Sequence, residues 1–231
     1  MKKITQEELD ELLIKHNLWL AGEAGGKRAI LFEYDLRNII MRNCDLRRCV
    51  MSKCDMRDCI ISNCELSGSG MLGSDMRNCN IGKCDMRNCT ISKCDLSNCN
   101  ISKCDLSGSD LSNCNTSGAK IFFPIACPEE GEFIGFKKVN DLVVKLKITE
   151  DAKRCSATSR KCRCSKAIVL SITNIDGTES DKTEVASDHD GAFIYRVGET
   201  VEEPKFCEDR WNECSEGIHF FITRKEAEDY R

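Results

Sequence analysis

The sequence contains no apolar run that approaches the length of a membrane span, so we expect no integral membrane segment. Its start does not resemble a signal peptide, because Lys2 and Lys3 precede the acidic Glu7, Glu8 and Asp10 rather than an apolar core. Aromatic residues make up 6% of the chain and no basic stripe is interleaved with them, so direct nucleic-acid binding is not expected. These absences predict a cytoplasmic protein.

The sequence also lacks the common motifs of catalysis. It has no glycine-rich phosphate loop, no serine nucleophile motif and no pair of metal-binding carboxylates. We therefore expect no cofactor and no metal, and we favour a protein that is not an enzyme.

Cysteine, in contrast, is abundant, with 18 residues in a chain of 231. Between residues 29 and 123 it recurs every five positions, and Leu, Met or Ile follows two positions later. Ser or Ala replaces Cys in some units, so this slot requires a small residue. A helix buries residues about every 3.6 positions and a strand every second one. A period of five over nineteen units instead predicts short extended segments joined by corners, which is a solenoid.

The two periodic positions of each unit are expected to line the interior. Representative interior residues are Cys44, Cys64, Cys84, Cys104, Leu46, Leu66, Met86 and Leu106. The Cα–Cβ bonds of stacked cysteines would run parallel, with their Cβ atoms ~4.8 Å apart. This separation exceeds the Cβ–Cβ distance of ~3.8 Å that a disulfide prefers. We interpret the thiols as small apolar fillers of a narrow core, best kept reduced in the cytoplasm.

Units such as C-D-M-R-N (84–88), C-T-I-S-K (89–93) and C-D-L-S-N (94–98) resemble the pentapeptide repeat family. The resemblance implies a mainly β fold, a right-handed quadrilateral parallel β-helix with four units in each coil. It also implies that the small residue and the central apolar residue point inward. Nineteen units would give just under five coils over residues 29–123.

The same geometry stacks charged residues that lie twenty positions apart. One acidic column is Asp35, Asp55, Asp75 and Asp95, and the opposite column is Asp45, Glu65, Asp85 and Asp105. Because stacked like charges repel, we interpret the neighbouring arginines (Arg37, Arg57, Arg77, Arg47 and Arg87) as neutralising both columns. Residues 29–123 contain eleven acidic and twelve basic residues. Pentapeptide repeat proteins of the Qnr type are thought to imitate DNA with a strongly negative solenoid. Because the solenoid of this chain is nearly neutral, a role as a topoisomerase effector is disfavoured.

Residues 1–28 are predicted to cover the first coil, because an open solenoid end exposes strand edges and an apolar core. Thr5 and Glu8 have the spacing of a capping box, which predicts a helix over about 6–16. Leu9, Leu12 and Leu13 fall on one side of this helix. Residues 18–20 (Leu-Trp-Leu) are expected to follow it as an apolar plug.

Residues 124–231 lose the period of five and are predicted to form a small α+β domain. Strands are expected at 133–137, 142–148, 167–172, 193–197 and 218–222, with a helix at 224–230. Segments 127–138, 160–167 and 213–227 resemble a domain of unknown function found behind pentapeptide repeats in bacterial and phage proteins. We expect the domain to cover Phe122 and Phe123 at the upper end of the solenoid.

The densest polar cluster of this domain consists of Arg154, Arg160, Lys161, Arg163 and Lys166. It is a candidate site for an anion or phosphate. The alternative is a solvated connection that enters a strand, in which Cys162 and Cys164 point inward while Arg163 points outward. A metal site is disfavoured because the cysteines and histidines show no paired C-x-x-C spacing.

A second cluster provides weak catalytic candidates, Cys214 and His219. Residues 217–220 (G-I-H-F) and the helix after them resemble the G-I-Y-F strand and helix of ADP-ribosyltransferases. This resemblance implies that Lys137 occupies the position of the first-strand residue at the nicotinamide site. A histidine in an apolar run is more often a hydrogen-bonded core residue, so we assign no catalytic residue.

We therefore predict a non-enzymatic interaction protein, in which a rigid β-helix presents a C-terminal recognition domain to an unidentified protein partner. The alternatives are a ligand-binding or ADP-ribosyltransferase-like C-terminal domain, and a topoisomerase effector. The sequence does not indicate an oligomeric state.

Overall fold

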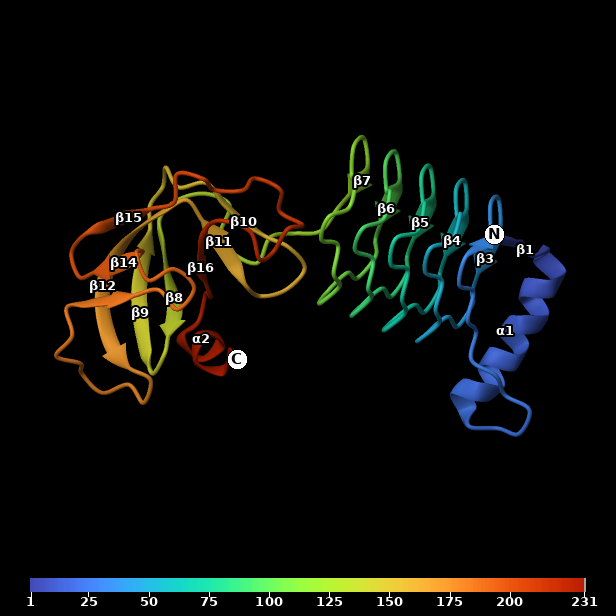
Figure 1. Cartoon of the computed structure of the whole chain (residues 1–231), viewed down its shortest axis with the longest axis horizontal. Coiled ribbons are helices and arrows are strands. Elements are labelled where there is room, and N and C mark those ends of the chain that lie inside the picture. Colours follow the sequence, from blue (N-terminus) through green and yellow to red (C-terminus); the bar gives the residue numbers. More distant parts are fainter. Residues whose placement is uncertain (231) are drawn as a thin grey trace. The chain divides into compact units, whose positions relative to one another are not determined.

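The computed structural model describes residues 1–230 and divides into two compact units, Met1–Pro124 and Ile125–Arg231, which are described separately. The first unit is a stack of regular coils that follows an N-terminal helix (Figure 1). Its elements are β1 (Lys2–Lys3), α1 (Gln6–Ala21), β2 (Tyr34–Asp35), β3 (Ile40–Arg42), β4 (Ile60–Ser62), β5 (Asn80–Gly82), β6 (Asn100–Ser102) and β7 (Lys120–Ile121).

Every face of the stack has the same register. Strands β3 to β7 form a parallel sheet in which each residue pairs with the residue twenty positions later, as Ile40 does with Ile60. The other faces carry isolated parallel bridges with the same offset, such as Asp35 with Asp55. Four units of five residues therefore make one coil, and neighbouring coils are ~4.8 Å apart. This confirms the predicted β-solenoid.

The interior consists of the predicted residues. The fully buried ones include Leu46, Leu66, Met86, Leu106, Cys64 and Cys84. Cys44 and Cys104 are half-buried, because they are the first and last members of their column.

In the Cys and Ser units the small residue also donates hydrogen bonds to backbone carbonyls, a role that the interpretation as an apolar filler misses. The Sγ atom of Cys79 lies 2.9 Å from the carbonyl oxygen of Met56, 23 positions earlier in the preceding coil. Ser74 Oγ donates in the same way to Met51 at 2.7 Å. Serine therefore substitutes for cysteine because both are small and both donate. All 18 cysteines are free thiols.

The corners explain the fifth position of each unit. This residue has a positive φ throughout the stack, as at Asn63 (54°), Gly68 (69°) and Lys93 (61°). Glycine and asparagine tolerate this left-handed conformation, whereas other residues adopt it at a cost of roughly 1–2 kcal/mol. The abundance of Asn and Gly at this position follows from the backbone and not from function.

The charged columns pair as predicted. Arg57 contacts Asp55 of its own unit at 2.7 Å and Asp75 of the next coil at 3.5 Å. Equivalent pairs join Arg37 with Asp35, Arg77 with Asp75, Arg47 with Asp45 and Arg87 with Asp85. The hydrogen bond from Arg57 holds the pKa of Asp55 below its usual range. The arginines thus neutralise much of both acidic columns.

Helix α1 covers the first coil and begins with the predicted capping box of Thr5 and Glu8. It extends to Ala21 and ends at Gly22, which has a φ of 72°. The prediction of a helix ending near residue 16 was therefore wrong. Residues 18–20 form the last turn of the helix instead of a separate plug.

A polar residue makes the most specific contacts of α1. The imidazole of His16 is buried beneath the helix together with Leu9 and Leu13. Its Nδ1 atom accepts the backbone N–H of Ala29 at 3.2 Å, and its Nε2 atom donates to the carbonyl oxygen of Arg47 at 3.0 Å. The first coil thereby gains partners for backbone groups that no preceding coil can bind.

The second unit combines three small antiparallel sheets with one short helix (Figure 1). Its elements are β8 (Phe133–Val139), β9 (Leu142–Ile148), β10 (Arg154–Ser156), β11 (Cys162–Cys164), β12 (Lys166–Asn174), β13 (Glu184–Ala186), β14 (Ile194–Arg196), β15 (Thr200–Glu202), β16 (Ile218–Phe220) and α2 (Arg224–Asp229). The strand orders are β15-β12-β9-β8, β10-β11-β16 and β13-β14. The predicted strands and terminal helix are confirmed in position. Strands β10, β11, β13 and β15 were not predicted.

The largest sheet packs its apolar face against β16. Val144, Leu146 and Ile148 of β9 are fully buried in the same core as Phe220 of β16. A Cβ atom at Gly135 would lie 2.6 Å from the Phe220 ring, so glycine is required where β8 and β16 approach. Within residues 1–230, neither helix is long and apolar enough to cross a membrane. Coverage of Phe122 and Phe123 by this domain stays a prediction.

Candidate ligand-binding site

The candidate site begins with a lysine at a position that should be apolar. Residues of a strand alternate between its faces, so positions 133, 135, 137 and 139 of β8 share one face. Phe133 and Val139 pack in the core, and Gly135 lies against Phe220. Lys137 belongs to this core-facing series, whereas the next residue, Lys138, belongs to the opposite face.

A cavity of about 800 Å³ lies beside Lys137, entirely within the second unit. Its volume is in the range of small-molecule sites. Aromatic rings contribute to its walls: Phe193, Tyr195, Phe221 and Tyr230. Two of these rings, Phe221 and Tyr230, have centroids 5.2 Å apart. The weak candidates Cys214 and His219 line this cavity together with Lys137, which is remote from them in sequence.

Lys137 has an unusual environment for an ammonium group. In the described part of the chain its Nζ atom has no hydrogen-bond or ion-pair partner, and it lies 5.9 Å from the centroid of the Tyr195 ring. The side chain is half-buried. Burial lowers the pKa of Lys137, the positive charge of Lys161 lowers it further, and the charge of Asp188 opposes both effects. The neutral form of the Lys137 amine is therefore easier to reach in this site than in water.

Lys161 is the second basic group of the cavity, and it is buried. Its Nζ atom lies 3.3 Å from the hydroxyl oxygen of Tyr230, 3.4 Å from Cys214 Sγ and 3.9 Å from a carboxylate oxygen of Glu213. Burial alone would lower the pKa of Lys161, but the hydrogen bond to Tyr230 and the electrostatic effects of Cys214 and Glu213 outweigh it and raise the pKa. Lys161 therefore stays cationic.

His219 is a neutral hydrogen-bonding group of the cavity. Its Nε2 atom lies 3.1 Å from the carbonyl oxygen of Glu213, so Nε2 carries the proton and donates it. Burial lowers the pKa of His219 to about 4, and the positive charges of Lys161 and Lys137 act in the same direction. The imidazole is therefore uncharged at neutral pH. Its burial and backbone partner agree with the core-residue interpretation.

Arg163 does not point outward as one interpretation of the sequence required. It is 1% exposed, and its guanidinium donates to the carbonyl oxygens of Cys207, Asp209 and Glu216. The segment between β15 and β16 is irregular and needs partners for its carbonyls, which explains why this arginine is drawn inside. The expectation of an exposed Arg163 was wrong.

The other basic candidates also contact partners within the domain. Arg154 donates to the carbonyl oxygens of Gly131, Thr149 and Glu150. Arg160 pairs with Glu226 at 2.7 Å, and Lys166 pairs with Asp151 at 2.9 Å and Glu202 at 3.2 Å. Of the five predicted anion-binding residues, Lys161 is the member that lines the described cavity. An anion site formed by all five stays a prediction.

Sequence reasoning missed the aromatic walls and the loop that holds Asp188, His189 and Asp190 beside the cavity. One signal was present, because a lysine interrupts the apolar alternation of β8. Across residues 1–230, no group of three or more His, Cys, Asp or Glu side chains is placed to hold a metal ion.

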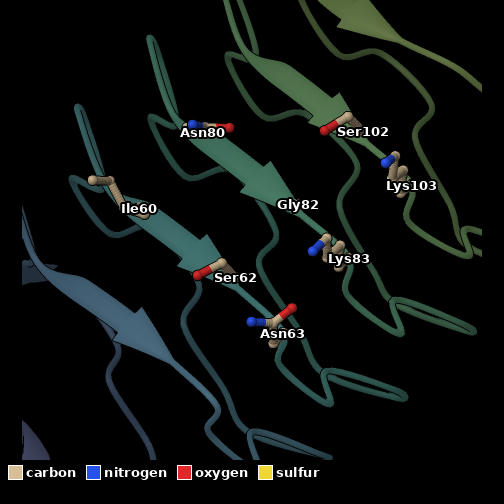
Figure 2. Close-up of a pocket in the computed structure, with 8 residues that line it drawn as sticks. All are labelled: Ile60, Ser62, Asn63, Asn80, Gly82, Lys83, Ser102 and Lys103. Carbon is tan, nitrogen blue, oxygen red and sulfur yellow. The ribbon is translucent and has the colours of Figure 1, made fainter.

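The solenoid has a second, smaller hollow of about 290 Å³ on the sheet of β4, β5 and β6 (Figure 2). Its lining residues are Ile60, Ser62, Asn63, Asn80, Gly82, Lys83, Ser102 and Lys103. Figure 2 shows Gly82 between Ser62 and Ser102, where a missing side chain leaves the space. The hollow is open to solvent and contains no aromatic residue, so it is the weaker candidate.

Fold and cavity together define a β-solenoid protein with a small α+β domain that can accommodate a ligand. The family model for pentapeptide repeats matches residues 29–68 and 79–118 (8 copies), and that of a family of unknown function (DUF5758) matches residues 123–227. The chain is thus a pentapeptide repeat protein with a C-terminal domain of that family. No curated protein matches it.

Several solved structures are similar to part of this chain. A pentapeptide repeat protein (Rfr23) from the cyanobacterium Cyanothece 51142 is 17% identical, with a TM-score of 0.34; the match covers 42% of this chain and 64% of that one. HetL from Nostoc sp. PCC 7120, involved in heterocyst differentiation regulation, is 19% identical (TM-score 0.27; 41% and 45% covered). QnrB1, a plasmid-mediated fluoroquinolone resistance protein, is 19% identical (TM-score 0.23; 41% and 49% covered). The chain thus spans less than two thirds of these proteins.

Proposed function

We propose that the C-terminal domain binds a small planar anion in the cavity beside Lys137, and that the solenoid is its rigid support. The observation that carries this proposal is the Lys137 ammonium group, which has no hydrogen-bond or ion-pair partner in residues 1–230. A desolvated charge without a partner costs free energy, and an anionic ligand would provide the missing partner.

The walls of the cavity favour a ligand that is planar as well as anionic. The rings of Phe193, Tyr195, Phe221 and Tyr230 offer apolar faces on which an aromatic group stacks. Lys161 provides a second positive charge, and its existing partners hold it in place. The cavity is also lined by charged groups of both signs, so the anionic group of the ligand is assigned to the side of Lys137 and Lys161, away from the carboxylates of Asp188, Asp190, Glu203 and Glu216.

This proposal is compatible with the predicted role as a non-enzymatic interaction protein, because binding requires no chemistry. In that role the ligand would occupy the C-terminal domain, while an unidentified protein partner would bind elsewhere on the chain. The ion pairs along both acidic columns support the expectation that the solenoid does not imitate DNA. Cytoplasmic location likewise stays a prediction.

The proposal can be tested by fluorescence titration with 8-anilinonaphthalene-1-sulfonate, an aromatic anion whose emission rises in apolar sites. We expect saturable binding with one site, and a Kd at least tenfold weaker for Lys137→Met. A hydrogen bond to a charged group contributes about 1.5–3 kcal/mol, and about 1.4 kcal/mol corresponds to a tenfold change. Lys137 is suitable for this test because, within residues 1–230, it has no hydrogen-bond or ion-pair partner to lose.

Two controls make the titration decisive. Lys145→Met removes an exposed lysine of β9 that does not line the cavity, and it should leave the Kd unchanged. The neutral analogue 1-anilinonaphthalene should bind wild type and Lys137→Met equally. Equal Kd values for the sulfonate in wild type and Lys137→Met would contradict the proposal.

An ADP-ribosyltransferase-like activity is the second candidate, and one observation favours it. Lys137, which the resemblance assigns to the nicotinamide site, lines the same cavity as His219 of the G-I-H-F segment. The test is nicotinamide release from NAD by the full chain, compared with His219→Ala. Absence of release above the buffer rate would remove this candidate, and it would leave the binding proposal intact.

A further inference from the structure

We propose that Lys137 forms an imine with its ligand, so that the cavity takes a planar anion that carries an aldehyde or ketone group. This inference rests on the proposed function, because it assigns chemistry to the same cavity. It identifies the ligand as a carbonyl compound and Lys137 as a nucleophile.

The contacts of three lysines distinguish Lys137 from its neighbours. Lys161 contacts three polar groups, and Lys138 donates to the carbonyl oxygens of Glu228 at 3.3 Å and Tyr230 at 3.0 Å. Lys137, by contrast, has no such partner among residues 1–230, and it lies beside the Tyr195 ring. Its amine is therefore free to approach an electrophile within the cavity.

The surroundings of Lys137 also favour the reactive form of the amine. Partial burial and a neighbouring cation are the two conditions under which lysines act as nucleophiles in proteins. Both are present, and they lower the pKa of Lys137 through burial first and through the charge of Lys161 second. His219 is uncharged and adds no positive charge of its own, while the carboxylate of Asp188 opposes the shift.

The reaction balances without an oxidant, a reductant or a metal. The neutral Nζ atom attacks the carbonyl carbon, and the electron pair of the C=O bond moves to oxygen. A proton passes from nitrogen to this oxygen to give a carbinolamine, which loses water and leaves a C=N bond. The ammonium of Lys161, which lines the same cavity, keeps hold of the anionic group when Lys137 reacts as the neutral amine and no longer pairs with it. Hydrolysis reverses the reaction, so capture is reversible.

The test uses 4-formylbenzoate as the aldehyde probe and sodium cyanoborohydride to trap the imine on the folded full chain. Peptide mass spectrometry then compares labelling at Lys137 with labelling at Lys138, which also lines the cavity but donates to two carbonyl oxygens, and at the exposed Lys145. We expect Lys137 to be labelled at least tenfold faster than either. The matched alcohol, 4-(hydroxymethyl)benzoate, cannot form an imine and should slow labelling by competition.

The outcomes separate this inference from the proposed function. Ligand-detected NMR with the alcohol measures reversible binding independently of labelling. If the alcohol binds but Lys137 reacts no faster than Lys145, the imine is refuted and the binding site stands. If the alcohol neither binds nor slows the labelling, both proposals fail. Lys137→Arg retains a positive charge, so it should keep the fold, and it should lose the selective adduct; an unchanged adduct yield would overturn the assignment.

Discussion

Replacement of Lys137 by Met is expected to stabilise the C-terminal domain while it weakens ligand binding. Methionine retains an unbranched stem of similar volume, and volume-conserving changes generally cost less than about 1.5 kcal/mol. The substitution removes an amine that is partly desolvated and unpartnered in the described chain. Relief of such functional strain typically stabilises by about 0.5–2 kcal/mol. Since the side chain is half-buried, we expect the lower half of this range.

The adjacent residue provides a matched control. Lys138→Met makes the same chemical change on the opposite face of β8, but it removes two hydrogen bonds to the carbonyl oxygens of Glu228 and Tyr230. We expect this variant to lose about 1 kcal/mol, because charged hydrogen bonds at partly exposed positions are screened by solvent. The two variants should therefore differ in the sign of their effect.

The assay is urea unfolding followed by the fluorescence of Trp211, which lies in the second unit. A Trp19→Phe background removes the signal of the tryptophan in α1. The slope of the transition should stay the same while its midpoint rises for Lys137→Met and falls for Lys138→Met. Destabilisation by Lys137→Met equal to that by Lys138→Met would refute the view that Lys137 is an uncompensated charge.

Further predictions concern both units. The pKa of His219 is about 4 in the folded domain against an ordinary 6.5, so the unfolded chain binds more protons below pH 6.5 and the domain becomes less stable as the pH is lowered. The difference of about 2.5 between the two pKa values corresponds to a loss of at most about 3 kcal/mol of unfolding free energy between pH 6.5 and pH 4. Urea unfolding of His219→Gln should lack this pH dependence. Cys79→Ser should be nearly neutral, because Ser74 makes the same bond, whereas Cys79→Ala should lose about 1 kcal/mol in thermal unfolding. Lys93→Gly should stabilise the solenoid by up to about 1 kcal/mol at its φ of 61°, and Lys93→Val should destabilise it. A gyrase supercoiling assay should show no change at stoichiometric excess of the protein; inhibition or protection would contradict the neutralisation of the acidic columns.

The solenoid was predictable because its determinants are local and repeated. The two periodic residues of each unit, such as Cys64 and Leu66, are the ones that are buried, so the sequence pattern indicates the core directly. Four units of five residues give the coil of twenty residues. The left-handed corners were not predicted, although Asn63 and Asn88 mark them in the sequence. His16 was also missed, since a histidine in a polar stretch gives no sign that it satisfies the backbone of the first coil.

The C-terminal site was harder to predict because it depends on contacts between distant segments. Strand β11 escaped detection because its central residue is Arg163, whose burial requires three carbonyls that lie more than forty positions away in the chain. The sequence indicated Lys137 and His219 through a single resemblance that covers few residues. That they share one cavity depends on the packing of β8 beside β16, which no local pattern encodes.

Crystallography with 4-bromobenzoate tests the central claim most directly, since bromine gives an anomalous signal and the carboxylate is the predicted partner of Lys137. We predict one strong bromine peak inside the cavity between the aromatic walls, with the carboxylate within hydrogen-bonding distance of the Lys137 amine. The peak should be absent from crystals of Lys137→Met. Bromine peaks confined to other surfaces of the wild-type protein, with an empty cavity, would contradict the account.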